Sequence, residues 1–240
     1  MLYRETGQLK ASYAEDQAIF PIAQDRWAMG ALLLVVFGVL PFIGDEYIYQ
    51  AVLIPVLVYS VAAIGLNLLT GYCGQLSLGT GAFMAVGAVA CFKLSTAYPD
   101  MNLILVFVFS GLIAAGTGLL FGIPSLRIKG FYLAVATLAA QFFLSWLFNK
   151  VAWFQNYAPS GTITMPPRDL FGVTITGAHA SPEARYVFCA VVVTILALLA
   201  KNIVRGPIGR SWMAIRDMDI AAELIGYRPF QTKLMAFSVS

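Results

Sequence analysis

Charged residues are scarce in this chain. Asp, Glu, Lys and Arg make up 11% of its 240 residues, whereas hydrophobic residues make up 60%. Ordinary soluble domains contain roughly 25% charged and about 45–50% apolar residues. The composition therefore excludes a water-soluble globular fold and predicts a membrane protein. The formal net charge of +3 is small, so nothing in it points to a nucleic-acid partner, and we expect it to face a lipid membrane.

Residues that usually carry metal or acid–base chemistry are also rare. The chain has three cysteines and one histidine, His179. Cys73, Cys91 and Cys189 lie in or beside apolar stretches without a Cys-x-x-Cys pair, so we expect buried free thiols and no metal site. The chain also lacks the Gly-x-x-x-x-Gly-Lys-Ser/Thr loop that holds nucleotide phosphates. We therefore expect no catalytic residues and no cofactor, and a protein that is not an enzyme.

Long apolar runs are abundant. About 20 apolar residues are needed for a helix to cross the hydrocarbon core of a bilayer. Runs such as ALLLVVFGVL do not alternate as the strands of a membrane β-barrel do. The sequence thus predicts an all-α, polytopic helical membrane protein with about six transmembrane helices, at residues 27–43, 48–70, 76–98, 101–122, 129–149 and 184–203.

Carboxylates are absent from the interior of these predicted spans, and Lys93 is the only charged residue away from their ends. Lys93 lies five residues before the end of its span, about 7.5 Å along a helix, so its ammonium group can reach the interface. An external substrate contact is the other interpretation. Ion-coupled carriers usually place titratable groups inside the membrane, so a secondary transporter is disfavoured.

The distribution of Lys and Arg predicts an orientation, because these residues concentrate in cytoplasmic segments. Residues 1–26 are polar and form a predicted cytoplasmic tail, and residues 150–183 form a predicted outer loop. Residues 204–233, which are basic, form a predicted cytoplasmic segment, and residues 234–240 begin a further span. We expect the domain of spans to cover residues 27–203.

Glycine and polar residues gather in the run GLNLLTGYCGQLSLGTGAFMAVGA, residues 65–88, which contains six glycines. Broken backbone at membrane depth is tolerated only inside protein or beside a water-filled cavity. We therefore expect a Gly-rich, interrupted span. The sequence leaves open whether residues 71–75 turn at the inner surface or midway through the bilayer.

The segment after the sixth span is amphipathic and predicts a short helix between two spans. Helical spacing places Trp212, Ile215, either Met218 or Asp219, and Ala222 near one face. Ala221 and Ala222 offer a small-residue surface, and Gly226 is predicted to end the helix.

This segment resembles a known signature. Ile220-Ala221-Ala222-x-x-x-Gly226 is similar to the EAA motif by which ABC importer permeases dock on their ATPases, with isoleucine in place of the leading glutamate. With GLNLLTGYCGQLSLGTGAFMAVGA and GIPSLRIKGFYLAVATLAAQ earlier in the chain, it resembles branched-chain amino-acid ABC transporter permeases over residues 52–240.

The resemblance implies a permease subunit of an ATP-driven importer in the bacterial inner membrane. It implies a sister permease subunit, two ABC ATPase subunits, and a periplasmic substrate-binding protein that delivers the amino acid. It also implies further spans after this helix, so we expect the chain to be truncated at its C-terminus. An ion- or proton-coupled secondary transporter or channel for small polar solutes is the alternative function.

Two groups of residues are the candidates for this function. The resemblance implies ATPase coupling by a cytoplasmic coupling helix, for which an ordinary membrane-surface helix is the alternative; its residues are Arg216, Asp219, Ala221, Ala222, Glu223 and Gly226. The second group can hydrogen-bond a zwitterion along a substrate path, although contacts between helices are the alternative role for each; its members are Asn67, Thr70, Gln75, Ser77, Thr80, Thr137 and Gln141.

Overall fold

The computed structural model describes residues 12, 23–126, 132–157, 163–170, 172–177 and 180–240. It divides into two compact units, Met1–Gly44 and Asp45–Ser240. Within the described residues, six helices are long and apolar enough to cross a membrane, which confirms the predicted all-α polytopic fold. They are Gln24–Ile43, Glu46–Tyr72, Thr80–Ala97, Leu103–Ser125, Tyr132–Lys150 and Pro182–Arg205.

The first unit contains one of these helices. This helix consists of α2 (Ala23–Leu34), the π-helical segment η1 (Val35–Val39) and α3 (Leu40–Ile43). Pro41 is the second residue after η1 and lacks the backbone N–H that an α-helix needs. The wider π turn before the proline is a known way for a helix to adapt to such a residue.

The second unit begins with a helix that also has a π-helical turn before a proline. Its parts are α4 (Glu46–Ile48), η2 (Tyr49–Leu53), α5 (Ile54–Asn67) and η3 (Leu68–Tyr72). Pro55 follows η2 as Pro41 follows η1. The helix pairs along its length with α9 (Pro182–Arg205), and the rings of Tyr49 and Tyr186 lie 5.5 Å apart.

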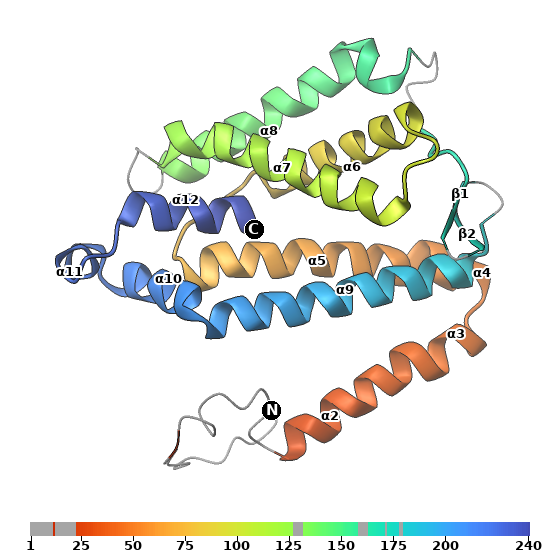
Figure 1. Ribbon diagram of the computed structural model, residues 1–240, viewed down its shortest axis with the longest axis horizontal. Helices are drawn as coiled ribbons and strands as arrows, with labels where there is room; N and C mark the ends of the chain where they lie inside the picture. Colours follow the sequence, from red (N-terminus) through yellow and green to blue (C-terminus); the bar gives the residue numbers. More distant parts are fainter. Residues whose placement is uncertain (1–11, 13–22, 127–131, 158–162, 171, 178–179) are drawn as a thin grey trace. The chain divides into compact units, whose positions relative to one another are not determined.

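The other long helices form a second group in this unit (Figure 1). They are α6 (Thr80–Ala97), α7 (Leu103–Ser125) and α8 (Tyr132–Lys150). α6 packs against both α7 and α8. Their shared core contains Ala82, Val86 and Leu144, with Phe83 and Phe121 packed against it.

A small β-hairpin lies at the α4 end of this unit, after the 3-10 helix η4 (Ala152–Gln155) (Figure 1). Strands β1 (Arg168–Leu170) and β2 (Val173–Thr176) pair antiparallel. The sequence analysis did not predict this hairpin. Arg168 secures it by donating hydrogen bonds to the carbonyls of Ser95 and Tyr98, at 2.6 and 2.7 Å, at the end of α6.

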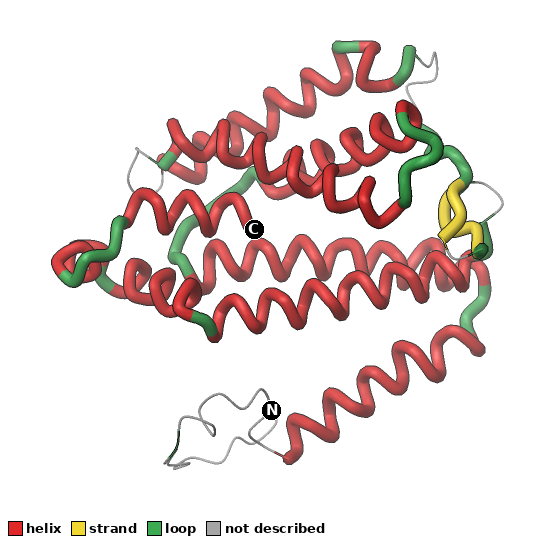
Figure 2. The backbone as a smooth tube through the Cα atoms, in the orientation of Figure 1, coloured by secondary structure: helices red, strands yellow, loops and turns green. Residues whose placement is uncertain are grey.

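Three short helices lie at the opposite end of the unit (Figure 2). They are α10 (Pro207–Asp217), α11 (Asp219–Leu224) and α12 (Pro229–Val239). α12 packs against α7, where a Cβ on Gly122 would lie 3.0 Å from the Phe237 ring. The spacing of Gly118 and Gly122 thus serves close helix packing.

Several predicted boundaries were wrong. The third span does not begin at residue 76, because residues 74–79 are not helical and α6 starts at Thr80. The single helix predicted after the sixth span is two helices, because Met218 is extended (φ −156°, ψ 97°) and separates α10 from α11. The other described span ends lie within a few residues of their predicted positions. His179, residues 129–131 and nearly all of the predicted tail lie outside the described residues.

Gly226 ends α11 as predicted. Its φ is +103°, a region that favours glycine because other residues meet their own Cβ there. Its N–H donates to Glu223 O and the N–H of Tyr227 donates to Ala222 O, both at 3.0 Å. These two bonds form the Schellman motif, which satisfies carbonyls left open at a helix C-terminus.

We expect Gly226→Ala to lower the thermal unfolding midpoint of the protein in detergent, because a side chain at positive φ costs roughly 1–2 kcal/mol. Gly116→Ala is the control, since Gly116 lies within α7 and a Cβ there meets no atom within 4 Å. That control should not lower the midpoint. Equal midpoints for Gly226→Ala and the wild type would contradict the assignment.

Candidate functional site

The non-helical segment between η3 and α6 is the centre of the candidate site. We call residues 73–79 the break. Its second residue, Gly74, has φ +69°, a left-handed conformation that turns the chain out of the preceding helix. A Cβ on Gly74 would lie 2.8 Å from Cγ of Arg216 in α10, so glycine is required here both by conformation and by space.

Buried polar side chains alternate with exposed apolar ones along the break. The polar residues Gln75 and Ser77 are 4% and 9% exposed, whereas Leu76 and Leu78 are 57% and 51% exposed. Extended backbone places successive side chains on opposite sides. The break therefore turns its polar side inward and its apolar side outward, which is the reverse of a segment on the surface of a soluble protein.

α8 holds the break in place through Thr137. The N–H of Leu78 donates to Thr137 Oγ1 at 2.9 Å, and this hydroxyl donates to Ala134 O at the same distance. A Cβ on Gly79 would lie 2.8 Å from Thr137 O. Thr137 lies five residues beyond Tyr132, about 7.5 Å along the helix, so the break reaches inward along α8.

Gln141 lies one turn further along α8, on the same side. Its Oε1 is 3.7 Å from the position that a Cβ of Gly81 would take. Thr80 is the first residue of α6. The structure thus brings four predicted path residues to one junction of the break, α6 and α8, namely Ser77, Thr80, Thr137 and Gln141.

Asn67 and Thr70 contact neighbours within their own helix. Thr70 Oγ1 donates to Leu66 O at 2.7 Å within its own helix. Asn67 is exposed, and its Oδ1 lies where a side chain on Gly71 would be. Both residues belong to the helix before the break.

Gln75 is buried without a partner. Within the described part of the chain, neither Nε2 nor Oε1 of its amide has a hydrogen bond. Burying an unpaired amide costs roughly 1–3 kcal/mol. Gln75 also helps to line a cavity of about 780 Å³ between the break and α10–α12.

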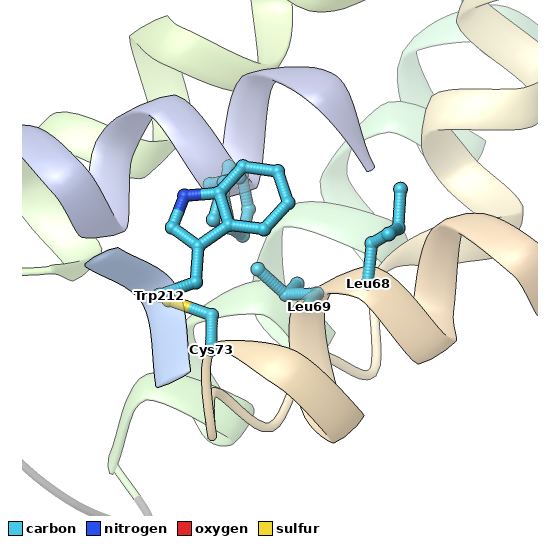
Figure 3. Close-up of a cluster of buried hydrophobic side chains, with 6 residues drawn as sticks. Leu68, Leu69, Cys73 and Trp212 are labelled. Carbon is cyan, nitrogen blue, oxygen red and sulfur yellow. The ribbon is translucent and has the colours of Figure 1, made fainter. Parts of the chain in front are cut away.

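Trp212 anchors α10 against the break. It is fully buried in a cluster with Leu68, Leu69 and Cys73, to which Ala236 and Phe237 of α12 also belong (Figure 3). Ile215 and Ala222, which helical spacing places near one face with Trp212, are 3% and 2% exposed. Met218 departs from that face and is 70% exposed, because the chain is extended at this residue.

Burial also acts on the thiol of Cys73, which lies just beyond the end of the second span. Burial raises the pKa of Cys73 to about 11, and the nearby positive charge of Lys233 opposes this increase. The thiolate is the reactive form of cysteine. Cys73 is therefore a poor nucleophile near neutral pH.

Arg216 links α10 to η3, the last turn before the break, by a hydrogen bond across 145 positions of the sequence. Its Nη1 donates to the carbonyl of Gly71 at 2.7 Å, and its Nε pairs with Asp217 Oδ1 at 3.0 Å. Asp219 pairs with Lys233 of α12 at 3.7 Å. Ala221 is half-buried and Glu223 is exposed on α11.

The sequence analysis missed the exposed apolar surface of α11. Ile220, Leu224 and Ile225 are 74%, 86% and 79% exposed. Ala222, in contrast, is covered by its own chain, so it supports α11 rather than offering a surface. The spacing of Ile220 and Leu224, which share a helix face opposite Ala222, was the signal available in the sequence.

Lys93 reaches the end of its helix. Its Nζ donates to Asn156 Oδ1 and lies 4.2 Å from the centre of the Trp153 ring. Both partners belong to the segment after α8. This contact agrees with a lysine whose ammonium group extends toward an interface.

Comparison with known proteins gives a consistent result. The family described as "Branched-chain amino acid transport system / permease component" matches residues 48–240. The "High-affinity branched-chain amino acid transport system permease protein LivM" of Salmonella typhimurium and that of Escherichia coli are each 31% identical, over 77% of this chain and 47% of the relative. The chain thus spans about half the length of these relatives. No solved structure matches.

The match covers the interrupted span, the break and all of α10–α12. Together with the six apolar helices, it places the chain among multi-pass transport proteins. The chain belongs to the permease components of branched-chain amino acid transport systems.

Proposed function

We propose that this chain is a permease subunit of an ATP-driven ABC importer for branched-chain or related amino acids. The observation that carries the proposal is the contact between α10 and the break, because it connects an exposed docking surface to the candidate path. At this contact Arg216 lies beside Gly74 of the break and donates a hydrogen bond to Gly71 O, in the last turn before the break, at 2.7 Å.

The docking surface consists of Ile220, Leu224 and Ile225 on α11. A contiguous group of exposed apolar side chains, unlike single exposed ones, often marks an interface. We propose that two ATPase subunits bind this chain and a sister permease, and that α11 is the element held by one of them. The polar residues Asp219 and Glu223 border this surface.

Movement of α11 would reach the break through α10. Trp212 ties α10 to Leu68, Leu69 and Cys73, and Arg216 hydrogen-bonds to Gly71. ATP binding would close the two ATPases and displace α11, and this displacement would reorient the break. Hydrolysis would then reset it. Packed elements with two arrangements are the usual carriers of such coupling.

The substrate path would pass the junction of the break, α6 and α8. Hydroxyl and amide groups of Ser77, Thr80, Thr137 and Gln141 can hydrogen-bond a zwitterion there without the strong retention that a full charge would cause. Gln75 joins them at the α10 end. Asn67 and Thr70 lie on the helix before the break and contact residues of that helix, so they are weaker candidates.

A periplasmic binding protein would deliver the amino acid at the end of the unit where the β-hairpin lies. This assigns α10–α12 and the N-terminus to the cytoplasm and the chain to the bacterial inner membrane. The distribution of Lys and Arg supports this orientation.

An ion-coupled carrier or channel is the alternative. Lys93 is its strongest candidate residue, yet its ammonium group is engaged by Asn156 and Trp153 at a helix end. Within the described parts of the six helices, the carboxylates lie in the first turns, at Asp25, Glu46 and Glu183.

We expect Leu224→Glu with Ile225→Glu to weaken association with the ATPase subunits at least about tenfold in a membrane pull-down. Losing two interface anchors commonly costs this much or more. Tyr47→Glu is the control, because Tyr47 is a 76% exposed apolar residue at the opposite end of the unit. Unchanged association of the double variant would overturn the docking assignment.

The driving force distinguishes the two functions. In proteoliposomes that contain the complete complex, uptake of labelled leucine should require ATP and should persist when an uncoupler collapses the proton gradient. Uptake that stops with the gradient and ignores ATP would establish a secondary carrier instead. Uptake that needs neither would establish a channel.

A further inference from the structure

The cavity between the break and α10–α12 lies apart from the junction of the break, α6 and α8, and of the proposed path residues only Gln75 lines it. Its volume is about 780 Å³, within the range of small-molecule sites in proteins. The break, α8, α10, α11 and α12 supply its wall, together with Leu126 at the end of α7. It therefore lies where α11 movements would meet the break.

Charges of both signs surround this cavity. Arg216 and Lys233 carry positive charge, and Asp217, Asp219 and Glu223 carry negative charge. The Lys233–Asp219 pair is loose, at 3.7 Å. A ligand with one positive and one negative group fits such a wall better than an ion of a single sign.

Another part of the same wall is apolar. Leu76, Leu126, Leu133, Ile215 and Phe230 contribute to it. This combination suits a molecule that joins an aliphatic side chain to a charged pair. A free branched-chain amino acid has this chemistry.

Gln75 is the second, independent indication of a ligand. It lines the cavity, is 4% exposed, and has no hydrogen bond to either amide atom within the residues described. These amide atoms are shielded from solvent in this conformation, so the side chain must turn to meet a ligand. A hydrogen bond to the carboxylate or ammonium group of a bound zwitterion would satisfy the amide.

We propose that this cavity is a binding site for the free zwitterion of a branched-chain amino acid, separate from the Thr137–Gln141 junction. The proposal rests on the proposed function for its class of ligand and for its cytoplasmic position. An amino acid bound here contacts both the break and α10–α12, and it therefore restrains their relative movement. The site makes import responsive to the internal concentration of its own product.

Equilibrium binding of labelled leucine to the purified chain tests this proposal, without ATPase or binding protein. We expect saturable binding that unlabelled isoleucine and valine displace. Gln75→Leu should weaken it about tenfold or more through the lost polar contact. Gln50→Leu is the matched control, because Gln50 lies outside this cavity and pairs with Glu46, and it should bind as the wild type does.

A second readout guards against a variant that fails to fold. In a background with Cys91→Ala and Cys189→Ala, leucine should slow the alkylation of Cys73, which also lines the cavity, and lysine should not. The reaction is measured at alkaline pH, where more of this thiol is ionised. Absence of leucine binding, equal binding by Gln75→Leu, or no protection of Cys73 would each overturn the proposal. These results leave the ATPase pull-down unaffected, so the two proposals fail separately.

Discussion

The hydrogen bond from Arg216 to the carbonyl of Gly71 joins two parts of the chain that are far apart in sequence. Glycine at position 74 leaves room for it, because a Cβ there would lie only 2.8 Å from Arg216 Cγ. Trp212 adds an apolar anchor one helical turn earlier. The position of α10, and through it that of α11 and α12, depends on this contact region.

The break provides the polar surface on which the proposed transport depends. Gln75 and Ser77 point inward and Leu76 and Leu78 outward, so a polar surface exists within an apolar bundle. Thr137 fixes the inner part of the break to α8. A segment without internal helical hydrogen bonds can change conformation at lower cost than a continuous helix. It is thus the natural place for movement of α11 to alter a path.

Much of the fold could be predicted from the sequence. The spans follow from apolar length, which depends little on tertiary contacts, and Gly226 ends α11 as its residue type indicates. The division at Met218 could not be predicted, because residues 216–219 contain neither proline nor glycine and only packing extends the chain there. The β-hairpin was missed because strands of three and four residues leave too short a pattern.

The candidate site was predicted in composition but not in arrangement. Thr137 and Gln141 share a side as helical spacing requires, and the structure adds that Leu78 and Gly81 are their neighbours. Ala222 was expected to offer a surface, but it is buried, and Ile220, Leu224 and Ile225 are exposed instead. Packing against α10 and α12 decides which face of α11 is exposed, so a local sequence pattern cannot predict it.

The ratio of leucine transported to ATP hydrolysed tests the central claim most directly. It should be measured for Arg216→Ala in proteoliposomes containing the complete complex, with the exposed Arg210 of α10 changed to Ala as the control. Hydrogen bonds to charged groups contribute about 1.5–3 kcal/mol, so the ratio should fall about tenfold or more for Arg216→Ala while ATP hydrolysis continues. The control should keep the wild-type ratio. A wild-type ratio for Arg216→Ala would contradict the coupling of α10 to the break.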